Sequence, residues 1–247
     1  MRGRLPTTAI APLLFACIAV SVGYLSLALF APETQIPTLC GAIGNLTWGD
    51  LPLALGPDWS SGALLWGWLL MLAAMMPPLI LRPLLAISAA RQRSMPFGIF
   101  ALGYFAAWGI FVIWLVPLTI LLIVSFGRPV SVVAILLLAL TWSMSPLCQH
   151  LRNLCHRGDW TAGATRTKGL GQLIQGCDYA MRCAGICWPW MVLSLCFDTY
   201  HLVAMAVISA YLVLDRASPP AVPRWQLPPS LQFALEKSRP QKALGRL

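Results

Sequence analysis

The chain has 247 residues, of which 58% are hydrophobic and only 10% are charged; its mean hydropathy is +0.74 and its formal net charge is +9. A water-soluble globular domain of this composition would expose very large apolar patches, so the composition excludes that class and indicates an integral membrane protein. Apolar runs of roughly 17 to 25 residues predict transmembrane helices. Such runs occur at about Ala9–Phe30, Gly62–Leu81, Phe97–Val124, Val130–Leu147, Gln172–Leu195 and His201–Leu214. We therefore expect an all-α, polytopic membrane domain with six transmembrane helices over residues 1–216.

The basic residues predict which side of the membrane each loop occupies. Lys and Arg are retained in the cytoplasm during insertion, whereas acidic residues have little influence. Four segments on one side carry nearly all of them: Arg2 and Arg4; Arg82, Arg91 and Arg93; Arg152, Arg157, Arg166 and Lys168; and Arg216, Arg224, Lys237, Arg239, Lys242 and Arg246. The opposite loops contain a single basic residue, Arg128. We expect both termini to be cytoplasmic, in a bacterial-type inner (plasma) membrane, and the positive charge to reflect this topology and contact with the lipid bilayer rather than with nucleic acid.

The first apolar run is expected to stay in the mature protein as a membrane anchor. Its length exceeds the roughly 7 to 15 apolar residues of a secretory signal. The proline- and glycine-rich residues 32–61 that follow it predict an external loop. This loop contains Cys40, which is placed on the same side as Cys196 at the outer end of the fifth run. A disulfide between these two cysteines and two separate free thiols are both compatible with the sequence.

The second run carries a pair of methionines next to a proline. Met71 and Met75 are four residues apart, so they share one helix face with Cβ atoms about 6 Å apart. Pro77 removes the backbone N–H that would bond the carbonyl of Ala73, which predicts a kink and a carbonyl in need of another partner. Two thioethers at a kinked helix are candidate ligands for a soft metal ion, although Met and Pro are also ordinary in transmembrane helices.

The fourth run ends in a second pair, Met144 and Cys148, followed by Cys155. If the helix continues, the two cysteines are about 10.5 Å apart along its axis, which is too far for one ion. Only a break after Cys148 would bring these thiols together with His150 and His156. The alternative is that the residues after the fourth run are solvated and bind nothing.

The fifth run contains the strongest metal-binding pattern, a stripe of Cys183, Cys187 and Met191 at steps of four residues. Adjacent members could share an ion, whereas the outer two are about 12 Å apart by helix rise. Thiolate and thioether ligands favour Cu(I), or Zn(II) where thiolates dominate. The predicted topology places the sulfur groups of runs two, four and five in the cytoplasmic half of the bilayer. The alternative is that they only fill apolar space, beside small residues such as Gly176 that indicate close helix packing.

Two pairs of charged residues lie within or beside the apolar runs. Asp178 and Arg182 are four residues apart, and Asp215 is adjacent to Arg216. Ionisable groups inside a membrane are costly and are usually paired or functional. The simpler interpretation is mutual neutralisation near the inner interface, and the alternative is a proton or ion pathway.

The last segment, residues 217–247, is rich in proline and basic residues. This composition predicts an extended cytoplasmic tail without a core of its own. The tail and the helix faces are candidate contact surfaces for other membrane protein subunits.

The chain also resembles a known family of unknown function, catalogued as predicted metal-binding integral membrane proteins. The resemblance covers runs two to six and is carried by Trp68 to Pro77 with Met71, Met75 and Met76, by Ser145-Pro146-Leu147 leading to Cys155, and by Cys183-x-Gly185-x-Cys187-Trp188 with Met191. The family pattern has a basic residue after Pro-Leu and a cysteine doublet before the Trp. Here Cys148 and Ile186 occupy those positions. The resemblance implies soft-metal binding.

Three functional hypotheses follow. The first is a membrane protein that binds Cu(I) or Zn(II) through Cys183, Cys187, Met191, Met75, Met71, Cys148, Met144 and Cys155, in copper handling or delivery. The second is a non-catalytic structural or assembly subunit of a larger membrane complex, since we find no set of nucleophile, base and orienting group. The third is a transporter, which we rank last because no inverted repeat is visible. No enzymatic activity is predicted.

Overall fold

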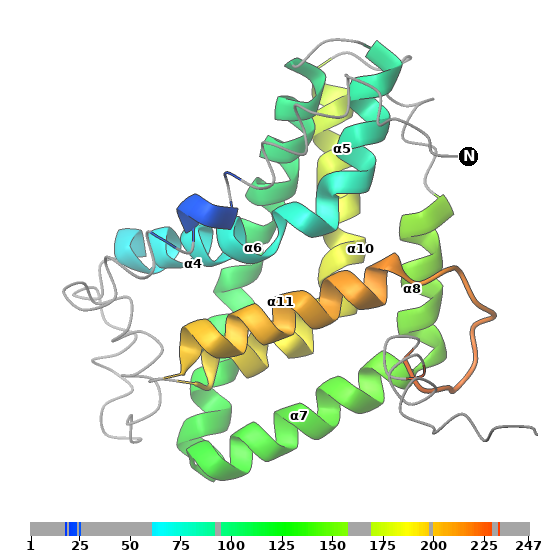
Figure 1. Cartoon of the computed structure of the whole chain (residues 1–247). Helices are drawn as coiled ribbons and strands as arrows, with labels where there is room; N and C mark the ends of the chain where they lie inside the picture. Colours follow the sequence, from blue (N-terminus) through cyan, green and yellow to red (C-terminus); the bar gives the residue numbers. More distant parts are fainter. Residues whose placement is uncertain are drawn as a thin grey trace, which may run out of the picture.

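The computed structural model of the chain describes residues 18, 20–23, 25, 61–91, 95–157, 169–197, 200–228 and 232. Within these residues the fold is all-α, as predicted (Figure 1). The helices are α4 (Ser61–Met75), α5 (Pro77–Arg91), α6 (Met95–Phe126), α7 (Arg128–Met144), α8 (Pro146–Arg157), α10 (Leu170–Leu195) and α11 (His201–Ala217). Most of the first predicted run, the external loop with Cys40, and the end of the tail lie outside the described residues.

Helix α10 is the central element of the fold. It packs most extensively against α6 and also contacts α7, α8 and α11 (Figure 1). Two glycines allow the backbones of α6 and α10 to approach closely. A Cβ on Gly103 would overlap the carbonyl oxygen of Leu173, and a Cβ on Gly176 would overlap that of Phe100. The close packing predicted from the small residues of α10 is therefore confirmed at Gly176.

Two predicted runs are broken helices. α4 and α5 meet at an angle of 65° beside Pro77, which confirms the predicted kink, and α5 continues beyond the predicted end at Leu81 to Arg91. α7 and α8 meet at 61°, with the break at Ser145. The second break falls before Cys148 instead of after it. Met144 and Cys148 therefore lie on different helices, and the prediction that they share one helix face is wrong.

Two prolines inside helices free backbone carbonyls, and aromatic side chains provide new hydrogen bonds to both. Pro83 has no N–H for the carbonyl of Leu79, which accepts a 2.9 Å hydrogen bond from the Tyr179 hydroxyl. Pro189 leaves the carbonyl of Gly185 free in the same way. That oxygen accepts a 2.8 Å hydrogen bond from the indole N–H of Trp142. Such substitute donors are what proline-containing helices need in an apolar environment.

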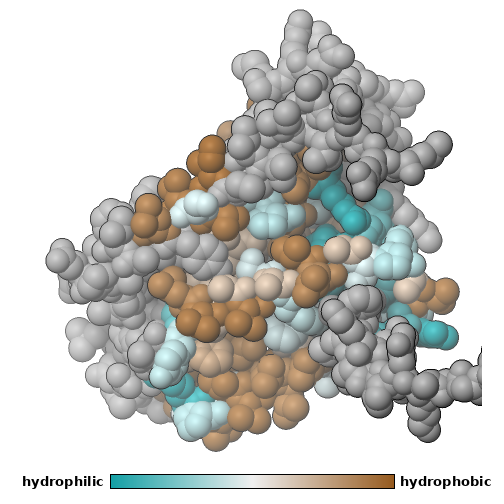
Figure 2. Space-filling model, in the orientation of Figure 1, coloured by the Kyte–Doolittle hydropathy of each residue, from teal (hydrophilic) through white to brown (hydrophobic). Residues whose placement is uncertain are grey.

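Helix α6 is long and apolar enough to cross a membrane over Gly98–Phe126. The bent pairs Trp68–Met75 with Pro77–Ile87, and Arg128–Met144 with Pro146–His156, meet the same test if each is one broken span. The described residues thus contain one to three candidate spans. Large apolar side chains of α6 and α7 are exposed, among them Leu102, Ile110, Ile113, Trp114, Leu121, Val130, Val133 and Leu137. Figure 2 shows part of this apolar surface over α7.

After α11 the chain continues without a helix from Ser218 to Pro228 and is attached to α8. The Asn153 side chain bonds both backbone groups of Ala221, donating to its carbonyl at 2.7 Å and accepting from its N–H at 3.2 Å. Further along, the N–H of Gln226 donates to the carbonyl of Met144 at 3.3 Å. The first part of the predicted tail is therefore fixed across the α7–α8 break.

Candidate metal centre

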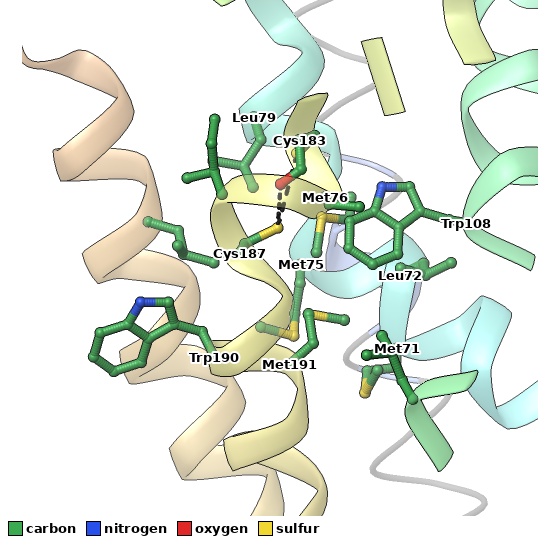
Figure 3. Close-up of a cluster of buried hydrophobic side chains, with 14 of the residues drawn as sticks. Met71, Leu72, Met75, Met76, Leu79, Trp108, Cys183, Cys187, Trp190 and Met191 are labelled. Atoms are coloured by element: carbon green, nitrogen blue, oxygen red, sulfur yellow. Dashed lines mark hydrogen bonds between the residues drawn. The ribbon is translucent and has the colours of Figure 1, made fainter. Parts of the chain in front are cut away.

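The centre of the candidate site is the pair of cysteines on α10. Cys183 and Cys187 are one turn apart and are 0% and 1% exposed. Their Sγ atoms are 4.0 Å apart, and the Cys187 thiol also donates to the carbonyl of Cys183 at 2.8 Å (Figure 3). The predicted i, i+4 spacing therefore places both thiols side by side in the protein interior rather than toward lipid.

The element Cys183-x-Gly185-x-Cys187-Trp188 is held by α7 and α8. The Trp188 ring packs edge-on against Trp142 of α7, with ring centroids 5.8 Å apart. Trp142 also donates to the carbonyl of Gly185, and a Cβ on Gly185 would lie only 2.8 Å from a terminal carbon of Leu151 on α8. These contacts fix the turn of α10 that carries the two thiols.

The buried cluster that contains the two thiols also contains four methionines, Met71, Met75, Met76 and Met191. Met71 and Met75 lie on α4, and Met76 lies at the break between α4 and α5; all three are buried. In the view of Figure 3, Met76 is drawn nearest to Cys187, with Met75 and the buried Met191 of α10 below it and Met71 farther away. The thioethers of the second run and the cysteine pair of the fifth thus belong to one buried core cluster.

The spacing of the thiols suits a shared soft ion. With a metal–sulfur bond of about 2.3 Å, the Sγ separation of 4.0 Å corresponds to a sulfur–metal–sulfur angle of about 120°. Both Sγ atoms could therefore reach one ion. The neutral sulfur donors of the same buried cluster that could join them are the methionine thioethers, which favour Cu(I).

Two residues that the sequence analysis did not select contact Cys183. The hydroxyl of Tyr104, which is fully buried on α6, donates to its Sγ at 3.3 Å. The Nη2 of Arg216 on α11 donates to the same Sγ at 3.4 Å, and its Nη1 donates to the Tyr179 hydroxyl at 3.4 Å. The Arg216 guanidinium also lies beside the Cys155 thiol. A cation and a phenol hydroxyl both stabilise negative charge on sulfur.

A second buried network adjoins the thiols on the α8 side. Arg152 of α8 forms an ion pair with Asp215 of α11 at 2.7 Å, and the two side chains are 1% and 5% exposed. Arg152 also donates to Gln149 at 2.7 Å, and its Nη2 lies 3.9 Å from the Sγ of Cys148. We had interpreted Asp215 as paired with Arg216, its neighbour in the sequence. Its ion-pair partner is instead Arg152 on another helix. The predicted pair of Asp178 and Arg182 is confirmed, at 2.6 Å.

The other predicted ligands are distributed around this network. Cys148 and Cys155 are buried in the same cluster as the cysteine pair, but α8 is continuous between them, so they remain two turns apart. Met144 is half-buried at the end of α7, and His150 is exposed. Within the described ranges no group of three or more His, Cys, Asp or Glu side chains could hold a metal ion. A metal role for these four residues stays a prediction.

Cys196, at the C-terminal end of α10, lies nine residues beyond Cys187. Cys196 is a buried free thiol whose Sγ donates to the carbonyl of Val192 at 3.3 Å. Its suggested disulfide partner, Cys40, lies outside the described residues. Cys196 is therefore a useful internal reference, because it is a buried thiol that directly follows the helix of the candidate ligands.

Comparisons with known proteins agree with a soft-metal role. A family model described as "PpoB2: Copper chaperone" matches residues 65–234, which include every helix from α5 to α11 and most of α4. No curated protein and no solved structure matches the chain. The matched region contains both cysteines of the pair and all the methionines around them. The chain therefore belongs to the PpoB2 family of copper chaperones.

Proposed function

We propose that this protein is a membrane-embedded copper chaperone that binds one Cu(I) ion between Cys183 and Cys187. The observation that carries the proposal is the pair of buried Sγ atoms 4.0 Å apart, beside the methionines of the α4–α5 break (Figure 3). A methionine thioether completes the coordination. Soft sulfur ligands in a site shielded from water hold Cu(I) in preference to harder ions.

The membrane setting follows from the composition and the candidate spans. In this proposal the six apolar runs cross a bacterial-type inner membrane, with both termini in the cytoplasm, and the broken helices count as single spans. The copper site then lies within the cytoplasmic half of the bilayer. From there the ion would pass to a recipient protein.

The test is a Cu(I) titration of the purified full-length protein in detergent micelles under anaerobic conditions, in competition with a Cu(I) chelator. We expect the wild type to bind about one equivalent, and Cys183→Ser with Cys187→Ser to lose at least about 100-fold in affinity, since thiolates are the strong ligands of a soft ion. Cys196→Ser is the matched control because Cys196 is an equally buried thiol of the same helix region, and it should bind like the wild type.

The same titration identifies the remaining ligands. Single substitutions of Met75, Met76 and Met191 by Leu keep the volume of each side chain and remove its sulfur, so the variant with weakened Cu(I) binding marks the third ligand. Cys148→Ser and Cys155→Ser test the two thiols of α8. A double cysteine variant that keeps its copper, or a Cys196 variant that loses it to the same extent, would refute the proposal.

A further inference from the structure

The guanidinium of Arg216 is a buried cation without a carboxylate partner among the described residues. Arg216 is 8% exposed. The ion pairs of the described helices join Arg152 to Asp215 and Arg182 to Asp178. The contacts of the Arg216 guanidinium are instead the Cys183 and Cys155 thiols, the Tyr179 hydroxyl and the Tyr179 ring, whose centroid is 5.8 Å away. These contact groups are all neutral while the thiols are protonated, so none of them balances the charge of the guanidinium.

A cation in this position requires an anion. An arginine side chain stays protonated in proteins, and a buried charge without a counter-charge costs several kcal/mol. The charge of Asp215 also acts on Arg216, but this carboxylate is paired with Arg152 at 2.7 Å, so one anion serves two guanidinium groups. Of the proposed ligand pair, Cys183 is in direct contact with Arg216, and it becomes negative when a metal binds, since thiols lose their protons on metal binding.

The charge of the loaded site depends on the ion. Two thiolates with a monovalent ion such as Cu(I) carry a net charge of −1, which Arg216 balances to zero. Two thiolates with a divalent soft ion such as Zn(II) or Hg(II) are neutral and leave the buried guanidinium uncompensated. Thioethers and phenols add no charge to either complex. Both ions start from the same empty site, so the protonation state of the thiols before binding cancels when the two affinities are compared.

We propose that Arg216 is the counter-charge of the copper site and makes the site selective for a monovalent soft ion over a divalent one. The inference rests on the proposed function, because it takes Cys183 and Cys187 as the ligands. Arg216 does not touch the metal in this arrangement. It determines specificity through the charge of the thiolate pair that it contacts.

The experiment compares Cu(I) and Hg(II), two soft ions that bind thiolates and differ by one unit of charge. Each is partitioned between the full-length protein in micelles and an excess of dithiothreitol, and the bound metal is measured by elemental analysis. Arg216→Gln removes the charge and keeps a polar side chain, whereas Arg216→Lys keeps the charge. Arg182→Gln is the matched control, because it removes an arginine charge from α10 whose bonds are to Asp178 and to the carbonyl of Leu154 rather than to Cys183 or Cys187.

We expect Arg216→Gln to lower the ratio of Cu(I) affinity to Hg(II) affinity by roughly 10- to 100-fold, the effect of one partly screened charge at close range. Arg216→Lys and Arg182→Gln should keep the ratio within about threefold of the wild type. If Arg216→Gln lowered the affinities for Cu(I) and Hg(II) by the same factor, the role of Arg216 would be purely structural and the inference would be overturned. If Arg216→Gln does not fold, a folded Arg216→Lys protein with a collapsed ratio overturns it equally.

The two proposals fail in different ways. A wild-type protein whose copper survives the double cysteine substitution refutes the proposed function, and the counter-charge with it. A wild type that binds Cu(I) through the two cysteines, with an unchanged ratio in folded Arg216→Gln, refutes the counter-charge alone.

Discussion

The ion pair between Arg152 and Asp215 provides a sharp test of how this fold balances its buried charges. The two side chains are 1% and 5% exposed and 2.7 Å apart. Asp215→Asn keeps the shape of the carboxylate but removes its charge. Arg152 then keeps one strong partner, the Gln149 oxygen at 2.7 Å, while its Nε already has no hydrogen-bond partner. The substitution thus leaves a fully buried cation without compensation.

Asp215→Asn should lower the free energy of unfolding strongly, although it replaces only one oxygen of the side chain by an amino group. Breaking a buried ion pair from one side costs about 3 to 5 kcal/mol, and we expect Asp215→Asn to lower the free energy of unfolding by that amount. Replacing both partners by apolar residues of similar size, Arg152→Met with Asp215→Leu, removes the cation together with the anion. Such replacements are often neutral or stabilising, but Gln149 then loses a partner at a cost of about 1 to 3 kcal/mol. The double variant should therefore be more stable than Asp215→Asn.

The measurement is equilibrium unfolding in mixed detergent micelles, with tryptophan fluorescence as the readout. It compares the wild type, Arg152→Met, Asp215→Leu and the double variant as one cycle, with Asp215→Asn beside them. The stability of the double variant, compared with the sum of the single changes, gives the coupling energy of the pair. We expect a coupling of at least about 2 kcal/mol. Additive effects, or an Asp215→Asn variant as stable as the wild type, would refute the conclusion that Arg152 depends on this carboxylate.

Three further predictions concern the packing and the hydrogen bonds of the site. Gly176→Ala should destabilise the protein in thermal unfolding by about 2 kcal/mol or more, because the new Cβ overlaps the α6 backbone; Gly98→Ala, where nothing lies within 4 Å, should be neutral or slightly stabilising. Trp142→Phe leaves the Gly185 carbonyl without its donor and should cost about 1 to 3 kcal/mol in the same assay. Tyr104→Phe removes a neutral hydrogen bond to the thiol of the site and should weaken Cu(I) binding by less than about tenfold in the chelator titration; a larger loss would contradict a supporting role for the hydroxyl.

The parts of the site that depend on local sequence were predictable. The i, i+4 spacing of Cys183 and Cys187 on a continuous helix sets their separation before any tertiary contact forms. The kink beside Pro77 follows from the missing N–H of one residue. The all-α class follows from apolar runs that only helices can satisfy in lipid. Each of these inferences uses residues within a single apolar run.

The parts that depend on contacts between distant segments were not predictable. The break at Ser145 is an exception, because it has a local cause that we missed: the residue before Pro146 is disfavoured in a helix, and we had considered a break only after Cys148. Asp215 was interpreted through its neighbour, yet its partner is Arg152 on another helix. Arg216 was interpreted as a topology signal and as the neighbour of Asp215, although it contacts Cys183. A single sequence contains no signal for such pairings, because they are set by how α8, α10 and α11 meet.

One chain of hydrogen bonds explains why these distant contacts converge on the thiols. The carbonyl of Leu79 is free because Pro83 has no N–H, and it accepts from the Tyr179 hydroxyl. That hydroxyl in turn accepts from Arg216, whose other nitrogen donates to Cys183. The proline of α5 thus creates the acceptor that positions Tyr179, and Tyr179 positions the guanidinium against the sulfur. The same helix that begins at the methionine-bearing break therefore also orients the charge beside the cysteine pair, so the soft ligands and their cation are fixed by one arrangement of α5, α10 and α11.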